Sequence, residues 1–191
     1  MHEVLRDPVF IRWAVLAIVP AMLDEVFRAF VTLYLQDVIH ADDAIVELLI
    51  TFETAAGFVG LLVLEFLIVR QLASSRILAW SAVIVLFGMV GLLTTHTLWF
   101  AGLMLCIVGA ASICWFPLAK AETYKRLPGR SGTVRAILSI GAPFSVILPS
   151  IVGFISGRFG ITAGVGFLGL APVIILVLVL LKTRPLNYVN P

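Results

Sequence analysis

Six long apolar runs, separated by short polar segments, account for almost the whole of this 191-residue chain. Each run exceeds the threshold of about 18 residues for a transmembrane helix, because a helix rises about 1.5 Å per residue and must cross roughly 30 Å of hydrocarbon. The pattern therefore predicts an all-α integral membrane protein, in which residues 1–191 form a single domain of six transmembrane helices. The predicted helices cover residues 10–35, 45–69, 77–95, 98–119, 134–156 and 162–181.

The composition excludes a soluble globular domain. Hydrophobic residues make up 61% of the chain and charged residues 13%, and the mean hydropathy is +1.13. Soluble domains are on average about 45–50% apolar and about 25% charged. The net charge of +2 gives no indication of a nucleic-acid partner. The lipid bilayer is therefore the first partner that the sequence predicts.

The basic residues at the ends of the predicted helices gather on one side of the membrane. A six-helix arrangement places all but two of the 13 Lys and Arg residues on the side of the chain termini. Cytoplasmic segments carry such an excess of basic residues, so both termini are predicted to be cytoplasmic. The residues on that side are Arg6, Arg12, Arg70, Arg76, Lys120, Lys125, Arg126, Arg130, Arg135, Lys182 and Arg184.

The first apolar run carries three charged residues near its middle, Asp24, Glu25 and Arg28. An ionised side chain near the bilayer centre costs on the order of 2.5–3.5 kcal/mol, so this helix is expected to face protein or water there. Both carboxylates can pair with Arg28, which follows them by four and three residues. Two interpretations stay open: an ion cluster that only neutralises itself, and a proton or substrate site. Pro20, one turn earlier, is expected to kink the helix.

The second apolar run carries Glu53, which is predicted to contact Arg28. Arg28 lies about 9 Å and Glu53 about 6 Å toward the outside from the centres of their runs, at about 1.5 Å per residue. Adjacent antiparallel helices would bring the two residues to a similar depth. Asp24 and Glu25 are then expected nearer the midplane. The third and sixth runs contain no charged residue and are predicted to be the lipid-facing pair.

The fourth and fifth runs offer weaker candidates. Ser112 and Trp115 lie in the segment SICWFP, where the tryptophan either stacks on a ligand or serves as a packing aromatic. Gly153 and Gly157 have the spacing that allows close helix approach. Nothing in the sequence resembles a metal site, a nucleophile–base pair or a haem ligand set. No enzymatic activity, metal or cofactor is therefore predicted.

Several segments resemble the C-terminal six-helix half of bacterial major facilitator superfamily transporters. LRDPVFIRW leads into the acidic LDEVFRAFVTLYL, and WFPLAKAETYKRLPGRSGTVRA enters a Gly- and Pro-rich fifth run. At the position of the family's signature loop, between the second and third helices, stands LLVLEFLIVRQLASSR, which keeps an acidic Glu65 and basic Arg70 and Arg76 but lacks the expected glycine and aspartate. By this resemblance the three residues are candidates for gating at the cytoplasmic side. From its depth, Glu65 is also expected to reach Arg70 or the headgroups and to be structural.

The resemblance implies one half of a secondary transporter in the bacterial inner membrane, built from two inverted three-helix repeats. Helices one and four would line the cavity, two and five would meet the other half, and three and six would stand outside. A small solute would cross by alternating access, and Asp24 or Glu25, with Arg28 as charge partner, would be the candidates for coupling to protons. Ser112 and Trp115 would be further cavity residues. A second six-helix half, a separate chain or a second copy, would be required. The alternatives are a non-transporting assembly partner and a truncated remnant or fragment.

Overall fold

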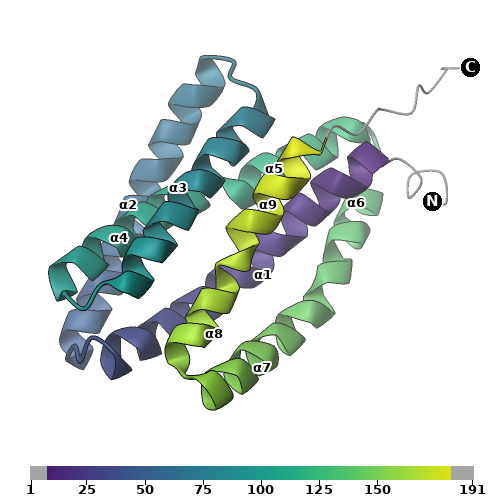
Figure 1. Cartoon of the computed structure of the whole chain (residues 1–191). Helices are drawn as coiled ribbons and strands as arrows, with labels where there is room; N and C mark the ends of the chain where they lie inside the picture. The colour runs from purple at the N-terminus through teal and green to yellow at the C-terminus, as the bar shows by residue number, and fades with distance from the viewer. Residues whose placement is uncertain (1–7, 182–191) are drawn as a thin grey trace, which may run out of the picture.

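The computed structural model of the chain describes residues 8–181, apart from the side chains of residues 21–23, 142, 144 and 145 (Figure 1). The described residues form helices joined by short connections, and they contain no β-strand. The all-α prediction is therefore confirmed. The helices are α1 (Pro8–Asp37), α2 (Asp43–Val69), α3 (Ser74–Thr94), α4 (Leu98–Ser112), α5 (Trp115–Arg126), α6 (Ser131–Leu138), the 3₁₀ turn η2 (Ser139–Gly141), α7 (Ala142–Phe159), α8 (Ile161–Leu168) and α9 (Leu170–Leu180).

These helices form long segments that run through the bundle (Figure 1). α1, α2 and α3 are continuous, whereas α4 with α5, α6 with α7, and α8 with α9 form broken segments. α1 has 30 residues and holds the three charged residues of the first apolar run. Such lengths and compositions are those of a helical membrane protein. Within the described residues, five segments are long and apolar enough to cross a membrane: Asp43–Val69, Ser74–Thr94, Leu98–Arg126, Ser131–Phe159 and Ile161–Leu180.

Prolines account for two of the breaks. Pro117 has no N–H to donate to the carbonyl of Ile113, and the chain breaks between α4 and α5 at that point. Pro172 likewise has no N–H to donate to the carbonyl of Leu168, the residue at which α8 ends. α1 continues through Pro20, so the kink predicted there does not interrupt the helix.

α1 crosses the bundle diagonally and joins its two sides (Figure 1). On one side α2 and α3 both pack against α4, and on the other α7 packs against α8. α1 contacts α5 and α8, and α3 contacts α9, so the two sides share one apolar core. The fully buried Tyr34 hydroxyl donates a hydrogen bond to the Leu92 carbonyl at 3.0 Å, which ties α1 to α3.

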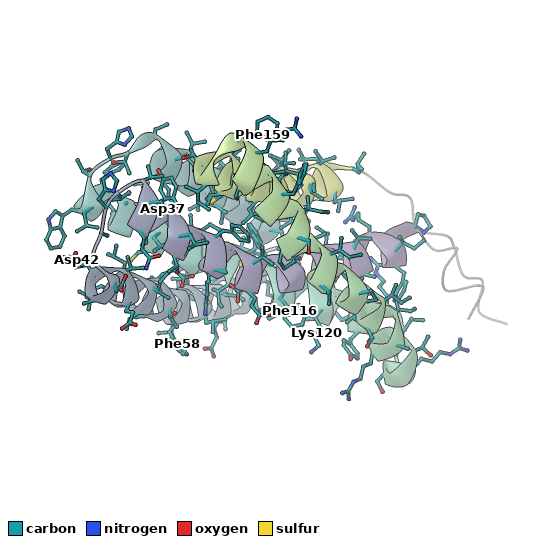
Figure 2. All side chains as sticks on the ribbon, turned by 90° about the horizontal axis from the view of Figure 1, so that it is seen from below. Asp37, Asp42, Phe58, Phe116, Lys120 and Phe159 are labelled. Carbon is teal, nitrogen blue, oxygen red and sulfur yellow. The ribbon has the colours of Figure 1, made fainter. Side chains whose placement is uncertain are left out.

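The start of α1 and the end of α9 lie at the same end of the bundle (Figure 1). There Arg12 Nη1 donates a hydrogen bond to the Leu181 carbonyl at 2.7 Å. Asp37 and Asp42, at the turn between α1 and α2, lie near the opposite end, as Figure 2 shows. The side of the chain termini and the side of the turn between α1 and α2 are thus the two ends of the bundle. Which end faces the cytoplasm stays a prediction.

Glycines bring α2 and α4 closer together than larger residues would allow. A Cβ atom on Gly60 would overlap a backbone carbonyl of α4, and one on Gly109 would lie 2.7 Å from a backbone oxygen of α2. By contrast, a Cβ on Gly153 would meet one ring atom at 3.9 Å, and none of the described atoms lies within 4 Å of one on Gly157. The spacing of Gly153 and Gly157, which allows close helix approach, is therefore not used for a close contact among the described residues. Spacing alone does not say which glycines face a neighbouring helix.

Among the five apolar segments, α2 and the α6–α7 segment are the least enclosed. In the most apolar 18-residue stretch of each segment, 22% is buried in α2 and 20% in α6–α7, against 44% in α3 and 33% in α8–α9. The third and sixth segments, which were predicted to be the lipid-facing pair, are more enclosed within this chain than the second and fifth, which the resemblance would place against another half. Which segments face lipid stays a prediction. A helix without charges packs in an apolar core as readily as against lipid, so the absence of charge does not show which of these two surroundings the helix has.

Candidate functional site

A cluster of three charged residues joins α1 to α2. Arg28 Nε lies 3.5 Å from Glu53 Oε2, and Arg28 Nη2 lies 3.8 Å from Asp24 Oδ1. The predicted contact between Arg28 and Glu53 is thereby confirmed. The exposed fraction of the side chains rises from 5% for Glu53 to 37% for Arg28 and 59% for Asp24. We call Asp24, Arg28 and Glu53 the central cluster.

Glu53 can be buried because Gly109 of α4 leaves space for its side chain. A Cβ atom on Gly109 would lie 2.8 Å from Glu53 Cγ and 2.9 Å from Glu53 Oε1, so only glycine leaves room for the carboxylate. Thr54 Oγ1 donates a weak hydrogen bond to Glu53 Oε2 at 3.4 Å. Sequence reasoning missed both Gly109 and Thr54. The sequence shows that Gly109 lies on the fourth apolar run, but it does not show which neighbouring helix Gly109 faces.

The central cluster carries an excess of negative charge. With all three groups ionised, two carboxylates share one guanidinium, which leaves a net charge of −1. The Nε atom of Arg28 is buried and has no hydrogen-bond partner among the described residues, although it lies 3.5 Å from Glu53 Oε2. Ion pairs between guanidinium and carboxylate are usually about 2.7–2.9 Å long. The cluster is therefore loosely paired, and it is unbalanced in charge when all three groups are ionised.

Two adjoining pockets meet at Asp24. The large pocket has a volume of about 500 Å³ and lies between α1, α3, α9 and the break that separates α4 from α5. The small pocket has a volume of about 80 Å³ and contains the central cluster. Asp24, Leu61, Ser112 and Ile113 line both. The acidic cluster thus opens directly onto a larger apolar space.

Both pockets reach the same face of the bundle. Phe58 lines the small pocket and Phe116 the large one. Figure 2 shows the side chains of Phe58, Phe116 and Lys120 projecting from that face, whereas Phe159 projects from the opposite one. The ammonium group of Lys120 lies over the Phe116 ring, 5.1 Å from its centroid.

The two weaker cavity candidates line the large pocket. Ser112 is half-buried at the end of α4, and its Oγ lies 3.5 Å from the Gly109 carbonyl. Trp115 is 4% exposed, and its Nε1 donates a hydrogen bond to Ser81 Oγ at 2.8 Å. The indole is therefore held by packing and by α3, and it forms a wall of the pocket as well. The partner Ser81 was not anticipated from the sequence.

Glu25 lies apart from the central cluster. It is exposed, it lines neither pocket, and it forms no ion pair with the described residues, although the sequence predicted that it could pair with Arg28. One residue along a helix turns the side chain by about 100°, which carries Glu25 away from the pocket that Asp24 faces.

The candidate gating residues Glu65, Arg70 and Arg76 are all exposed. The Arg70 guanidinium lies over the Phe66 ring, 4.5 Å from its centroid. Among the described residues, Glu65 makes no ion pair with Arg70. The structure does not bring these three residues together into a latch.

A second polar cluster, missed by sequence reasoning, links the start of α3 to the end of α5. Ser74 Oγ and Lys125 Nζ each donate a hydrogen bond of 2.8 Å to Glu122 Oε1. We call Ser74, Glu122 and Lys125 the end cluster. It lines neither pocket.

Metal binding has no candidate in the described part of the chain, where no group of three or more His, Cys, Asp and Glu side chains could hold an ion. No protein-family model matches the sequence, and no curated protein is detectably similar to it. A functional assignment therefore rests on the fold and on the two pockets.

Proposed function

We propose that this chain is one six-helix unit of a secondary transporter of the major facilitator type. It moves a small solute across the membrane by alternating access, together with a second six-helix unit. The observation that carries the proposal is the central cluster, an excess acidic charge near the middle of α1 that opens onto a large apolar pocket. Transporters commonly place such charges at mid-membrane depth, where helices are broken.

The excess charge supports coupling to protons at Asp24. Asp24 is the more exposed carboxylate of the central cluster and the one that reaches both pockets. A proton on Asp24 removes its attraction to Arg28, and this change can shift the balance between two conformations. Glu53 remains the buried partner of Arg28 in this scheme.

The exposed charges support the need for a second unit. Asp24 and Glu25 lie about 3 Å from the middle of α1, at about 1.5 Å per residue, and both are exposed on the isolated chain. Charged groups at that depth are costly against lipid. A second copy of the chain or a separate six-helix chain would cover them and enclose the pockets between the two units.

The mass of the protein in nanodiscs tests this requirement. We expect a dimer when the chain is expressed alone, or a stable complex only when a second six-helix chain is supplied. A chain that is stable and active as a monomer would contradict the requirement.

The topology belongs to the same proposal. We infer that the chain lies in the bacterial inner membrane with both termini in the cytoplasm, because the sequence places an excess of basic residues on the side of the chain termini.

Labelling of a single cysteine tests alternating access without knowledge of the substrate. Ser112→Cys, in a chain whose Cys106 and Cys114 are replaced by alanine, places a thiol where the two pockets meet. A membrane-impermeant thiol reagent should label it in both right-side-out and inside-out vesicles. Val152→Cys is the matched control, because Val152 is fully buried and lines neither pocket.

Labelling of Ser112→Cys from one side only, or from neither, would contradict the proposal and favour a non-transporting assembly partner. Labelling from both sides in vesicles that also leak small ions would indicate a pore instead of a carrier. A carrier is accessible from both sides and stays sealed.

A further inference from the structure

We propose that the large pocket binds a lipophilic organic cation, with Asp24 as its counter-charge. This substrate class rests on the proposed function, since it takes the large pocket to be the substrate site of the carrier. Three features of the pocket carry the inference: its apolar and aromatic wall, its single charge, and the backbone carbonyls at its broken helices.

The wall of the pocket suits a large apolar body. Val85, Met89, Val108 and Leu168 are each at most 4% exposed in the assembled bundle and line the pocket from several helices. With a volume of about 500 Å³, the pocket lies within the range of roughly 300–1,000 Å³ that holds drug-sized ligands. A small, strongly hydrated solute would lose its water there without finding enough polar partners.

The charge of the pocket selects a cation. Asp24 is the one ionisable residue among the described residues that line it, and the central cluster has an excess of one negative charge when its three groups are all ionised. Arg28 lines only the small pocket, where Glu53 faces it. A monovalent cation beside Asp24 would balance the cluster, whereas an anion would add to the repulsion.

The aromatic rings give a second attraction for positive charge. Phe27 and Trp115 line the pocket, and the face of an aromatic ring attracts a cation within about 6 Å of its centroid. Phe116 lines it as well, but Lys120 already lies over that ring. Phe27 and Trp115 are therefore the rings available to a ligand.

The broken helices add backbone acceptors. Pro117 and Pro172 line the pocket and have no N–H to donate, so the carbonyls of Ile113 and Leu168 lack their usual helical donors. Ile113 and Leu168 also line the pocket. Carbonyl oxygens near a ligand favour positive over negative charge, as unwound backbone does at other membrane ion sites.

Binding to the unaltered chain tests the charge preference directly. The full chain in nanodiscs would be titrated with tetraphenylphosphonium, with neutral triphenylphosphine oxide and with anionic tetraphenylborate, and uptake by empty nanodiscs would be subtracted. We expect saturable binding of the cation, about tenfold or more tighter than that of either other compound, the loss expected for one missing charged contact. No saturable binding of the cation, or equal binding of the neutral compound, would overturn the proposal.

Substitution of Asp24 tests the assigned residue. Asp24→Asn should weaken tetraphenylphosphonium binding about tenfold or more, whereas Asp24→Glu should retain it. Glu25→Gln is the matched control, since Glu25 is the adjacent carboxylate but lines neither pocket. Equal losses for Asp24→Asn and Glu25→Gln, or unchanged binding in Asp24→Asn, would overturn the assignment. The unaltered-chain titration decides the charge preference even if a variant fails to fold.

A flux measurement separates this inference from the transport proposal. Tetraphenylphosphonium uptake into sealed proteoliposomes, driven by an imposed membrane potential, would be compared with uptake into protein-free liposomes. Selective binding without protein-dependent flux would overturn the transport proposal and leave the cation site standing. Alternating labelling of Ser112→Cys without cation binding would overturn the substrate class and leave the transport proposal standing.

Discussion

The two polar clusters of this protein are built from similar groups but differ in balance and surroundings. In the end cluster, Glu122 accepts two hydrogen bonds of 2.8 Å, one of them from Lys125, and the ion pair is balanced one to one. In the central cluster the ion-pair distances are 3.5 and 3.8 Å, and two carboxylates share one guanidinium.

The difference separates a structural contact from a candidate working site. The end cluster has short bonds and no adjoining pocket, and it holds α3 against α5. The central cluster opens onto both pockets and keeps a buried Arg28 Nε without a hydrogen-bond partner among the described residues. A loosely paired, unbalanced group at mid-membrane depth costs stability, and such groups are retained where they serve a function.

The largest expected effect comes from removing the space that the central cluster needs. Gly109→Ala would place a Cβ 2.7 Å from a backbone oxygen of Glu53, so either α2 or α4 must shift. We expect a loss of about 2 kcal/mol or more in unfolding free energy, as for an overpacked core. Denaturation of the purified protein in mixed micelles would measure the loss.

The matched control for this change is Gly157→Ala, because none of the described atoms lies within 4 Å of the added Cβ. It should leave stability unchanged or slightly raised, since alanine is the better helix former. Equal losses for the two variants would contradict the close approach of α2 and α4 at Gly109.

A smaller effect is expected from breaking the central ion pair. A double-mutant cycle of Arg28→Ala and Glu53→Ala should give a coupling free energy of about 1–2 kcal/mol. This is less than for a fully buried pair, because the Arg28 side chain is 37% exposed and the separation is 3.5 Å. The same denaturation experiment measures it. A coupling near zero would show that the two residues do not interact, and the comparison of the clusters would fail.

The smallest effect is expected at the end cluster. Glu122→Ala should cost about 1 kcal/mol or less, because the Lys125 side chain is 69% exposed and the pair is screened by water. The contribution of Glu122 to the unfolding free energy should shrink further at high salt, whereas the coupling of Arg28 with Glu53 should change little. Melting temperatures at low and high salt would check this contrast. A loss at Glu122 that exceeds the coupling between Arg28 and Glu53 would reverse the comparison.

Much of the central cluster could be predicted from the sequence. The positions of Asp24 and Arg28 on one helix, and the similar depth of Glu53 on the next, were enough to predict the contact that the structure contains. These are properties of helix rise and spacing, which are the same in any fold. The same geometry allowed Glu25 to pair as well, because spacing on one helix does not say which way that helix is turned.

The sequence by itself determined the helices and their membrane character, because crossing a bilayer depends on a local sum of apolar transfer free energies along each run. Only the tertiary structure decided which faces meet. These helices are apolar on nearly every side, so their patterns hold little information about rotation. Three features depend on contacts between residues far apart in the chain: the space for Glu53 beside Gly109, the large pocket at the break between α4 and α5, and the hydrogen bond from Trp115 to Ser81. Such contacts are fixed by side-chain packing between helices, which no single run of sequence contains.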